Sequence, residues 1–456
     1  MQTGDTIAAL STPRGVGALA VLRVSGAEAR SLVERLMAPG GTADFPVQRP
    51  FLAELRWKGK SLDRALVTYF RAPRSFTGED VVEISCHGSP YVAERILEAL
   101  YEAGGRPAEP GEFSFRAFLH GKLDLAQAEA LNDLIRARTE FAAQAARAQM
   151  EGKLSGEIGA VRNLLVSVFG RLSAAVDFVE EDVDFGSVEE EMEELAGRLA
   201  RLHASYERGR LLREGACVAL VGAPNVGKST LFNRLVGRDR AIVTDVPGTT
   251  RDAVSETVDV GGLAVTFFDT AGMRKARGRV EREGVRRSEQ AVRETDLLLV
   301  LLDSSRGLTA RDTAVLEETR NRSHVTVWNK CDLKPASPSK SKKGAAFEEF
   351  RLADAPRISA KTGEGLDALE RLLEEKLVGE PPRGDELLLT NARHRDLVGR
   401  AREAVERAGA SLKARMSEEL VASDVRLAIQ SLGELTGVIT TEDVLDYVFG
   451  NFCIGK

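Results

Sequence analysis

The pattern of apolar and polar positions divides the chain into four segments. Residues 1–119 contain short apolar runs that are typical of strands, separated by turn signals, and two amphipathic stretches that are typical of helices. This segment is predicted to be a small α/β domain. Its strands are expected at 6–10, 18–26, 65–70 and 81–88, and its helices at 27–37 and 91–104.

A helical pattern replaces the strand pattern from about Lys122. It covers residues 120–213, gives way to strand–loop–helix units in 214–378, and returns in 379–456 after the Pro/Gly-rich stretch GEPPRGDELL. The helices on both sides of 214–378 have one apolar face each and need a partner to bury it. We therefore expect one helical domain into which an α/β unit is inserted.

The inserted unit begins with CVALVGAPNVGKST, an apolar strand followed by the spacing of a phosphate-binding loop. Gly222 and Gly227 allow backbone N–H groups to turn toward phosphate oxygens. Lys228 is expected to reach the β- and γ-phosphates, and Ser229 to ligate Mg²⁺. This motif by itself predicts only that the chain binds a nucleoside triphosphate.

Four further motifs narrow the nucleotide to GTP, because each has a role at a guanine-nucleotide site. PGTTRD (247–252) supplies Thr249 and Thr250, one of whose hydroxyls can complete the Mg²⁺ shell; Thr250 is the expected ligand. DTAG (269–272) supplies Asp269 for a metal-bound water and the Gly272 N–H for the γ-phosphate. NKCD (329–332) provides Asp332 as acceptor for both guanine N–H groups, and SAK (359–361) provides a backbone N–H for the guanine oxygen. The predicted GTP-binding residues are Asn225, Val226, Gly227, Lys228, Ser229, Thr230, Thr244, Asp245, Val246, Pro247, Gly248, Thr249, Thr250, Asp269, Thr270, Ala271, Gly272, Asn329, Lys330, Asp332, Ser359, Ala360 and Lys361.

The residue that would orient the attacking water is not evident from the motifs. Switch GTPases carry a glutamine directly after DTAG, whereas this chain has Met273, which cannot hydrogen-bond a water. Either hydrolysis is slow or another polar group takes over. Arg274, Glu281 and Glu283 follow nearby, and without further information the default interpretation is that they belong to a solvated switch loop.

Composition limits the other classes of function. The net charge of −6 over 456 residues argues against a protein held on nucleic acid mainly by charge. The N-terminus lacks a basic, apolar leader, and the four cysteines form no CxxC pair, which favours reduced thiols in the cytoplasm and does not favour zinc. Cys453 lies fourth from the end of the sequence, but CIGK is not a prenylation signal.

Taken together, these motifs resemble the MnmE (TrmE) family of tRNA modification GTPases. The match includes SFTGED, PGEFSFRAFLHGKLDLAQAEA, the acidic DFVEEDVDF, the five GTPase motifs and the terminal FCIGK. His120 is a local departure, since the family carries asparagine there. The resemblance implies an N-terminal tetrahydrofolate-binding α/β domain that dimerises, a central helical domain and an inserted Ras-like P-loop G domain.

The resemblance also assigns roles to residues whose roles the chemistry alone leaves open. Catalysis is expected from Lys228 and from Glu281, which would orient the attacking water through a second water. K⁺ would be held by Asn225, Thr244, Val246 and Thr249, and would stimulate hydrolysis as two G domains associate.

A folate site is implied at Arg23, Glu83, Lys122 and Lys456, for 5,10-methylene-tetrahydrofolate or its analogue 5-formyl-tetrahydrofolate. A carboxylate can accept the paired donors of a pterin, and a cation can pair with the glutamyl tail. The tail of the chain would bring Cys453 near this pocket, as a thiolate nucleophile or simply as a packed residue.

The implied function is a cytoplasmic, homodimeric GTPase that has no membrane partner. With the flavoprotein MnmG (GidA), as a heterotetramer, it would add an aminomethyl or carboxymethylaminomethyl group to carbon 5 of the wobble uridine of certain tRNAs. Two alternatives stay open: a ribosome-assembly GTPase, which predicts a basic RNA module, and a folate-dependent aminomethyltransferase that works without the flavoprotein.

Overall fold

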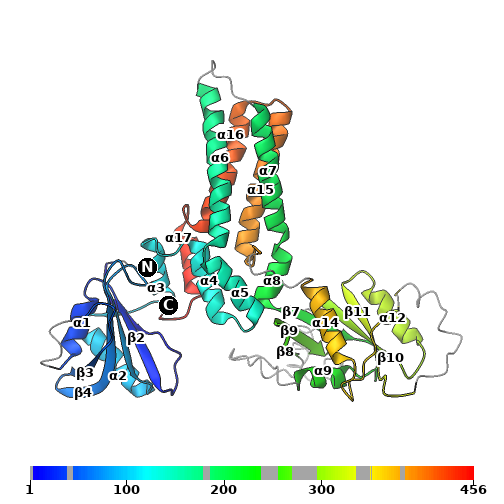
Figure 1. The fold of residues 1–456 in the computed structure, drawn as a ribbon, viewed down its shortest axis with the longest axis horizontal. Helices are drawn as coiled ribbons and strands as arrows, with labels where there is room; N and C mark the ends of the chain where they lie inside the picture. The colour runs from blue at the N-terminus through cyan, green and yellow to red at the C-terminus, as the bar shows by residue number, and fades with distance from the viewer. Residues whose placement is uncertain are drawn as a thin grey trace, which may run out of the picture. The chain divides into compact units, whose positions relative to one another are not determined.

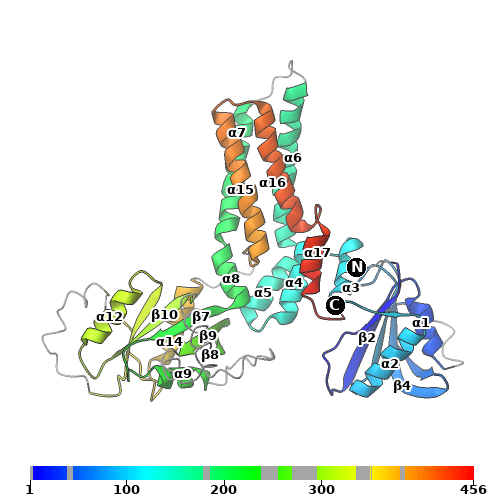
Figure 2. The same cartoon turned by 180° about the vertical axis from the view of Figure 1, so that it is seen from behind.

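The computed structural model describes residues 4–38, 45–177, 185–237, 255–269, 295–334, 350, 352–379 and 386–455. Figures 1 and 2 show the fold from opposite sides. Backbone contacts divide the chain into two compact units. Unit 1 comprises Met1–Asn132, Gln149–Met192 and Glu403–Lys456, and unit 2 comprises Asp133–Ala148 and Glu193–Arg402.

Unit 1 contains a six-stranded sheet with the strand order β3-β4-β5-β2-β1-β6. Neighbouring strands are antiparallel except β1 and β6, which run parallel. The four predicted strands are confirmed, whereas β3 and β6 were not predicted from the sequence. The strands are β1 (Ile7–Leu10), β2 (Leu19–Ser25), β3 (Phe51–Trp57), β4 (Lys60–Phe70), β5 (Val81–His87) and β6 (Arg106–Pro107).

Helices cover the two faces of this sheet unequally. Helices α1 (Ala29–Leu36) and α2 (Pro90–Glu102), both predicted, bury their apolar stripes against one face, where alternate residues of β2 and β5 form the core. Helix α3 (Glu112–Leu119), which was not predicted, places Phe113 against Ile7 and Ala9 on the opposite face. Side chains of the two faces alternate along β2, so Arg23 and Ser25 also lie on the α3 face.

Helices make up the rest of unit 1. Helix α6, from before the predicted insertion, packs along α16, from after it, which confirms the pairing expected from their apolar faces (Figures 1 and 2). Helix α17 packs Phe449 against Phe115 of α3. Besides α1, α2 and α3, the described helices that lie wholly or partly in unit 1 are α4 (Leu125–Arg136), α5 (Glu140–Met150), α6 (Lys153–Asp177), α7 (Phe185–Ala204), α15 (Ala392–Lys413), α16 (Glu418–Thr436) and α17 (Glu442–Gly450).

Unit 2 contains a five-stranded sheet with the strand order β11-β10-β7-β9-β8. All neighbours are parallel except β8 and β9, and every residue of β10 is buried, as an apolar run covered on both faces should be. The strands are β7 (Ala216–Val221), β8 (Ser255–Val260), β9 (Leu263–Asp269), β10 (Leu297–Asp303) and β11 (His324–Asn329). Among the described residues, unit 2 also contains the helices α8 (Tyr206–Glu214), α9 (Lys228–Val236), α12 (Ala310–Thr319) and α14 (Leu366–Leu377).

The order of this sheet positions the nucleotide motifs. Four parallel strands, β11, β10, β7 and β9, end at the same edge, and β7 lies between β10 and β9. Ligands of open α/β sheets bind outside the carboxyl ends of such strands. In the part of the chain that the structure describes, no helix is both long enough and apolar enough to cross a bilayer.

Candidate functional site

The phosphate-binding loop leaves β7 and leads into α9, as its sequence predicts. The ammonium of Lys228 is buried and donates hydrogen bonds to the carbonyl oxygens of Gly222 and Ala223, at 2.8 and 3.0 Å. The ammonium is therefore held inside the loop, at the N-terminus of α9, where a helix favours an anionic group.

A close approach to the base-recognition segment makes glycine necessary in this loop. Gly227 has φ of 102°, and a Cβ there would lie 2.3 Å from Asn329 Nδ2. The same Asn329 amide donates to the Val226 carbonyl at 2.8 Å. The two motifs, about a hundred residues apart in sequence, thus form one rigid piece.

The predicted Mg²⁺ ligand lies beside the acid of the DTAG motif. Ser229 Oγ donates to Asp269 Oδ2 at 2.6 Å, and Asp269 is buried at the end of β9. Mg²⁺ prefers oxygen ligands and keeps several waters, so a hydroxyl beside a carboxylate is a donor set that fits this ion. Thr250, the second expected ligand, lies outside the described residues.

The guanine-recognition residues are brought together by backbone and side-chain hydrogen bonds. Asn329 Oδ1 accepts from the Ala360 backbone N–H at 2.9 Å, and Ser359 Oγ donates to Asp332 Oδ1 at 2.7 Å. Lys330 has φ of 65° and pairs with Asp303. Lys361 is exposed next to this group. These hydrogen bonds bring the NKCD segment, which we call the base-recognition loop, against the SAK segment.

Several predicted residues fall outside the described part of the chain. The potassium-binding and switch residues Thr244, Asp245, Val246, Pro247, Gly248, Thr249 and Thr250 are among them. So are Thr270, Ala271, Gly272 and the catalytic candidate Glu281. Asn225 and Thr230 are described, and both are exposed. Asn225 adopts φ of 64°, a left-handed conformation that asparagine tolerates better than most residues.

The structure joins the first two folate candidates. Arg23 and Glu83 face each other across β2 and β5, and both Arg23 Nε and Nη2 donate to Glu83 Oε1, at 3.0 and 2.7 Å. The guanidinium lies over the rings of Phe76 and Phe113. Its Nη1 is buried and, among the described residues, has no hydrogen-bond partner. A ligand that accepts a hydrogen bond would satisfy this donor.

The end of the chain lies along the same side of unit 1. The Gly111 N–H donates to the Cys453 carbonyl at 3.4 Å, and Ser11 Oγ donates to the Gly455 carbonyl at 3.2 Å. Cys453 itself is exposed. Leu10, which contacts Gly455, is one residue along β1 from the position opposite Arg23. Arg23 is paired with Ala9 on β1 and with Glu83 on β5, and we call these three positions the Arg23 row. The tail therefore runs close to the Arg23 row of the sheet.

The other two folate candidates are less informative. Lys122 is exposed at the turn after α3, where its backbone N–H donates to the Ala117 carbonyl. Lys456 lies outside the described residues. His120, the departure from the family pattern, ends α3, and its Nδ1 lies 2.8 Å from the Arg116 carbonyl oxygen.

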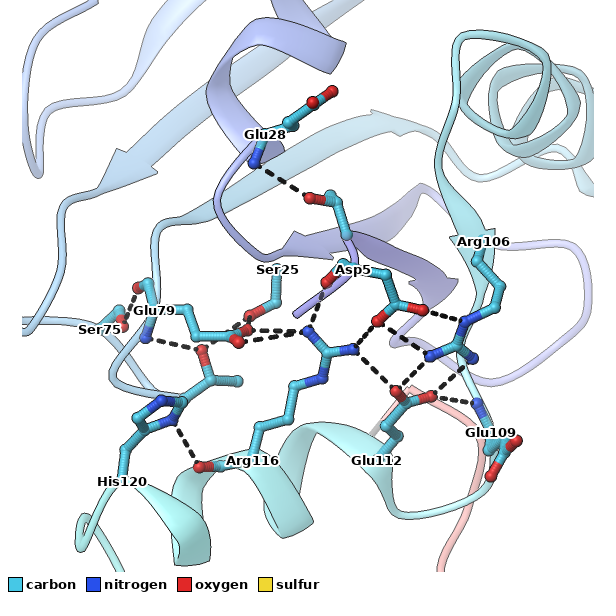
Figure 3. A network of polar contacts seen from close by, with 12 residues as sticks. Asp5, Ser25, Glu28, Ser75, Glu79, Arg106, Glu109, Glu112, Arg116 and His120 are labelled. Atoms are coloured by element: carbon cyan, nitrogen blue, oxygen red, sulfur yellow. Dashed lines mark hydrogen bonds and ion pairs between the residues drawn. The ribbon is translucent and has the colours of Figure 1, made fainter. Parts of the chain in front are cut away.

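An ion network next to the Arg23 row was missed by the sequence analysis. Arg116 of α3 is 1% exposed and contacts the carboxylates of Asp5, Glu79 and Glu112 (Figure 3). Arg106 contacts Asp5 and Glu112 as well. The hydrogen bond from Arg106, together with that from Arg116, lowers the pKa of Asp5 to about 2 in spite of partial burial. The available signal was a charged residue within the apolar run FSFRAF.

The hydroxyl of Ser25 connects this network to the strand that carries Arg23. Ser25 Oγ donates to Glu79 Oε2 at 2.7 Å, and Ser25 lies two residues after Arg23 on the same face of β2. The network therefore fixes α3, the 75–80 loop and the end of β2 together. These are the segments that surround Arg23.

Comparisons with known proteins give a consistent match. A family model described as the MnmE helical domain matches residues 125–453, and one described as the GTP-binding protein TrmE N-terminus matches residues 6–122. The chain is 42% identical to the tRNA modification GTPase MnmE of Moorella thermoacetica, and 43% identical to that of Symbiobacterium thermophilum. Each alignment covers 99% of both chains. Among solved structures, a variant of Aquifex aeolicus Era bound to GDP and AlF4⁻ is 27% identical over 41% of this chain and 66% of its own, at a TM-score of 0.27.

Proposed function

Since the chain belongs to the MnmE family of tRNA modification GTPases, we propose that it modifies the wobble uridine of certain tRNAs together with the flavoprotein MnmG (GidA). It is a GTP hydrolase of the P-loop class. The proposed product carries an aminomethyl or carboxymethylaminomethyl group at carbon 5 of the uridine. The one-carbon unit would come from 5,10-methylene-tetrahydrofolate, and the reaction would take place in the cytoplasm.

The observation that best supports the nucleotide part is the joined geometry of the P-loop and the base-recognition loop. The Lys228 ammonium is held within the P-loop, the Ser229 hydroxyl lies beside the Asp269 carboxylate, and Asn329 links both loops. When bound, Mg²⁺ would neutralise charge on the β- and γ-phosphates. This chain's residues would bind and orient GTP around it.

We assign the missing catalytic functions to K⁺ and Glu281. Met273 occupies the position where a water-orienting glutamine is common, so another group must take that role. K⁺ would be bound by Asn225, Thr244, Val246 and Thr249, and would add positive charge beside the phosphates. Association of two G domains would order these segments, which makes hydrolysis depend on protein concentration.

The folate proposal rests on the Arg23 row of the sheet. The buried Nη1 of Arg23 lacks a partner among the described residues, and Glu83 offers a carboxylate beside it. Such a pair fits a ligand that has both donors and acceptors, as a reduced folate has. Lys122 and Lys456 would bind its glutamyl carboxylates, and Cys453 would lie close by.

The homodimer proposal is supported by the exposed face of the unit 1 sheet. Leu19, Leu52 and Leu66 lie on the face opposite α1 and α2, and each is about half exposed or more. Leu52 and Leu66 are paired in register on β3 and β4. Adjacent exposed leucines of this kind mark a surface that a second protein copy can cover.

The function is tested by reconstituting the tRNA reaction with purified components. Substrate tRNA, GTP, Mg²⁺, K⁺ and methylene-tetrahydrofolate are incubated with this chain, with and without the flavoprotein, and nucleosides are analysed by mass spectrometry. We expect modified uridine only when both proteins are present. Modification without the flavoprotein would instead support an independent aminomethyltransferase, and no modification in either case would contradict the proposal.

Two variants separate the folate and GTPase parts. Arg23→Gln should abolish folate binding and uridine modification but leave GTP hydrolysis intact, and Arg95→Gln on the exposed side of α2 is the control. Glu281→Ala should abolish hydrolysis with nearly unchanged GTP affinity.

The potassium assignment is tested by exchanging K⁺ for Na⁺ in the hydrolysis assay. The exchange should slow GTP turnover, and equal rates in the two salts would eliminate the potassium assignment.

A further inference from the structure

A buried carboxylate lies directly behind the base-recognition loop, outside the five GTPase motifs. Asp303, the last residue of β10, is only 7% exposed. Its Oδ2 accepts a hydrogen bond from Lys330 Nζ at 2.6 Å. Its Oδ1 accepts from the backbone N–H and the hydroxyl of Ser305, at 3.0 and 2.6 Å. Both carboxylate oxygens of Asp303 therefore accept hydrogen bonds, and Oδ2 binds Lys330 of the NKCD motif.

The sheet brings Asp303 and Lys330 together. Strands β10 and β11 are parallel neighbours, with Asp303 opposite Asn329, and the Ser304 N–H donates to the Asn329 carbonyl at 2.9 Å. Lys330 follows Asn329 directly. The two side chains thus come from the ends of adjacent strands, at the edge where the nucleotide motifs meet.

Lys330 needs this support because of its backbone conformation. Its φ of 65° lies in the left-handed region, which is unfavourable for a residue with a Cβ. The neighbouring motif residues are held in other ways: Asn329 by Val226 and Ala360, and Asp332 by Ser359. Asp303 is the acid that holds Lys330, and so it restrains the part of the loop between Asn329 and Asp332.

The contact is an ion pair at neutral pH. Burial by itself would raise the pKa of Asp303, but the hydrogen bonds from Lys330 and Ser305 outweigh it, and the pKa lies below its ordinary value. Arg306 contributes a weaker contact, with Nε 3.8 Å from Asp303 Oδ2. A charge-assisted bond of this kind is stronger than a neutral one and fixes the lysine more firmly.

We propose that Asp303 is a positioning residue for guanine recognition: it anchors Lys330 and thereby keeps Asp332 where it accepts both N–H groups of the base. Loosening the anchor lets Asp332 move relative to the base, and the second hydrogen bond, from the guanine amino group, suffers most. Asp303 itself does not contact the nucleotide. Its loss weakens nucleotide binding and lowers the discrimination against bases that lack this amino group.

The test uses the full chain and compares Asp303→Asn with Asp296→Asn. Asp296 lies just before the opposite end of β10 and is also ion-paired, with Arg210 at 2.6 Å, so its loss perturbs the same strand away from the nucleotide edge. Dissociation constants for GTP and ITP are measured with fluorescent analogues, together with kcat and KM. ITP is the probe because its base lacks the amino group.

For Asp303→Asn we expect Kd for GTP to rise about tenfold, the order expected from one lost charge-assisted bond. The Kd ratio of ITP to GTP should fall by about threefold, while kcat at saturating GTP changes little. Asp303→Glu should recover part of the affinity. Asp296→Asn should lower thermal stability without changing either Kd.

If Asp303→Asn behaves like Asp296→Asn in affinity and in the ITP to GTP ratio, Asp303 is only structural and the proposal fails. If Asp303→Asn does not fold, Ser305→Ala decides, because it removes one hydroxyl donor to Asp303 and leaves Lys330 intact. This variant should raise Kd for GTP about twofold and lower the ratio in the same direction. Unchanged values for Ser305→Ala would also overturn the proposal.

Discussion

Replacing Arg116 by methionine tests how strongly the sheet of unit 1 depends on one buried cation. Methionine has a similar length, so the substitution removes the charge and the donors and leaves most of the packing volume. Arg116 donates to the Asp5 carbonyl and carboxylate, to both oxygens of Glu79 and to Glu112, over distances of 2.6 to 3.2 Å. All of these acceptors lose a cationic partner at once (Figure 3).

The magnitude follows from the burial of the partners. Removing one member of a buried ion pair costs about 3–5 kcal/mol, because a charge is left without compensation. Arg106 still contacts Asp5 and Glu112 in the variant, and Asp5 is 34% exposed to water. Glu79 has no such second cation among the described contacts. We therefore expect the low end of the range, about 3 kcal/mol.

The assay is urea unfolding of the full chain, monitored by tryptophan fluorescence. The chain has two tryptophans, Trp57 in β3 of unit 1 and Trp328 in β11 of unit 2. In a Trp328→Phe background, Trp57 alone reports on the sheet. Arg95→Met is the matched control, because Arg95 pairs with Glu98 at the surface and such pairs contribute about 0–1 kcal/mol.

The reasoning also predicts a partial rescue. Adding Glu79→Gln to Arg116→Met removes the least compensated charge, so the double variant should be more stable than Arg116→Met alone by about 1 kcal/mol or more. If Arg116→Met unfolds at nearly the same urea concentration as Arg95→Met, the buried cation does not stabilise the sheet. In that case the network is incidental to stability.

Two further results are expected from the same unit. The stabilisation that the Asp5 carboxylate gives is complete above its ordinary pKa of 3.8 and is lost as the pH falls through about 2. The unfolding free energies of wild type and Asp5→Asn should therefore converge as the pH falls from 3.8 to about 2. A difference in unfolding free energy that stays constant over this pH range would contradict the ion pairing. Gly455→Ala would place a Cβ 2.3 Å from the Leu10 carbonyl, so the tail should detach and be digested by carboxypeptidase several times faster than in Gly450→Ala, where the added Cβ meets no atom within 4 Å. Equal digestion rates would mean that the tail is not held there.

The positions of the P-loop and of the NKCD motif follow from the sequence because their determinants are local. Each of these two motifs lies at the end of an apolar strand, so the loop sequence and the strand before it are enough to place Lys228 and Asn329. The parallel sheet then gathers the strand ends without further information.

What the sequence did not predict depends on partners that are far apart along the chain. Arg116 is buried through Asp5, which lies 111 residues away, and no local pattern signals such a contact. Helix α3 was missed because its apolar face meets both the sheet and Phe449 of α17, so it has no simple amphipathic period. Asp303 was not singled out from the sequence, because its contact is with the left-handed Lys330 at the end of the next strand.

The contact between Ser11 and Gly455 joins positions 444 residues apart, and both lie in unit 1. On the ribosome, the first strand emerges early, but the tail residue that contacts it is synthesised 444 residues after Ser11. The N-terminal sheet can acquire its full set of contacts only after Gly455 has emerged. A nascent chain stalled before the tail should therefore be more easily attacked by proteases at β1 than the released protein.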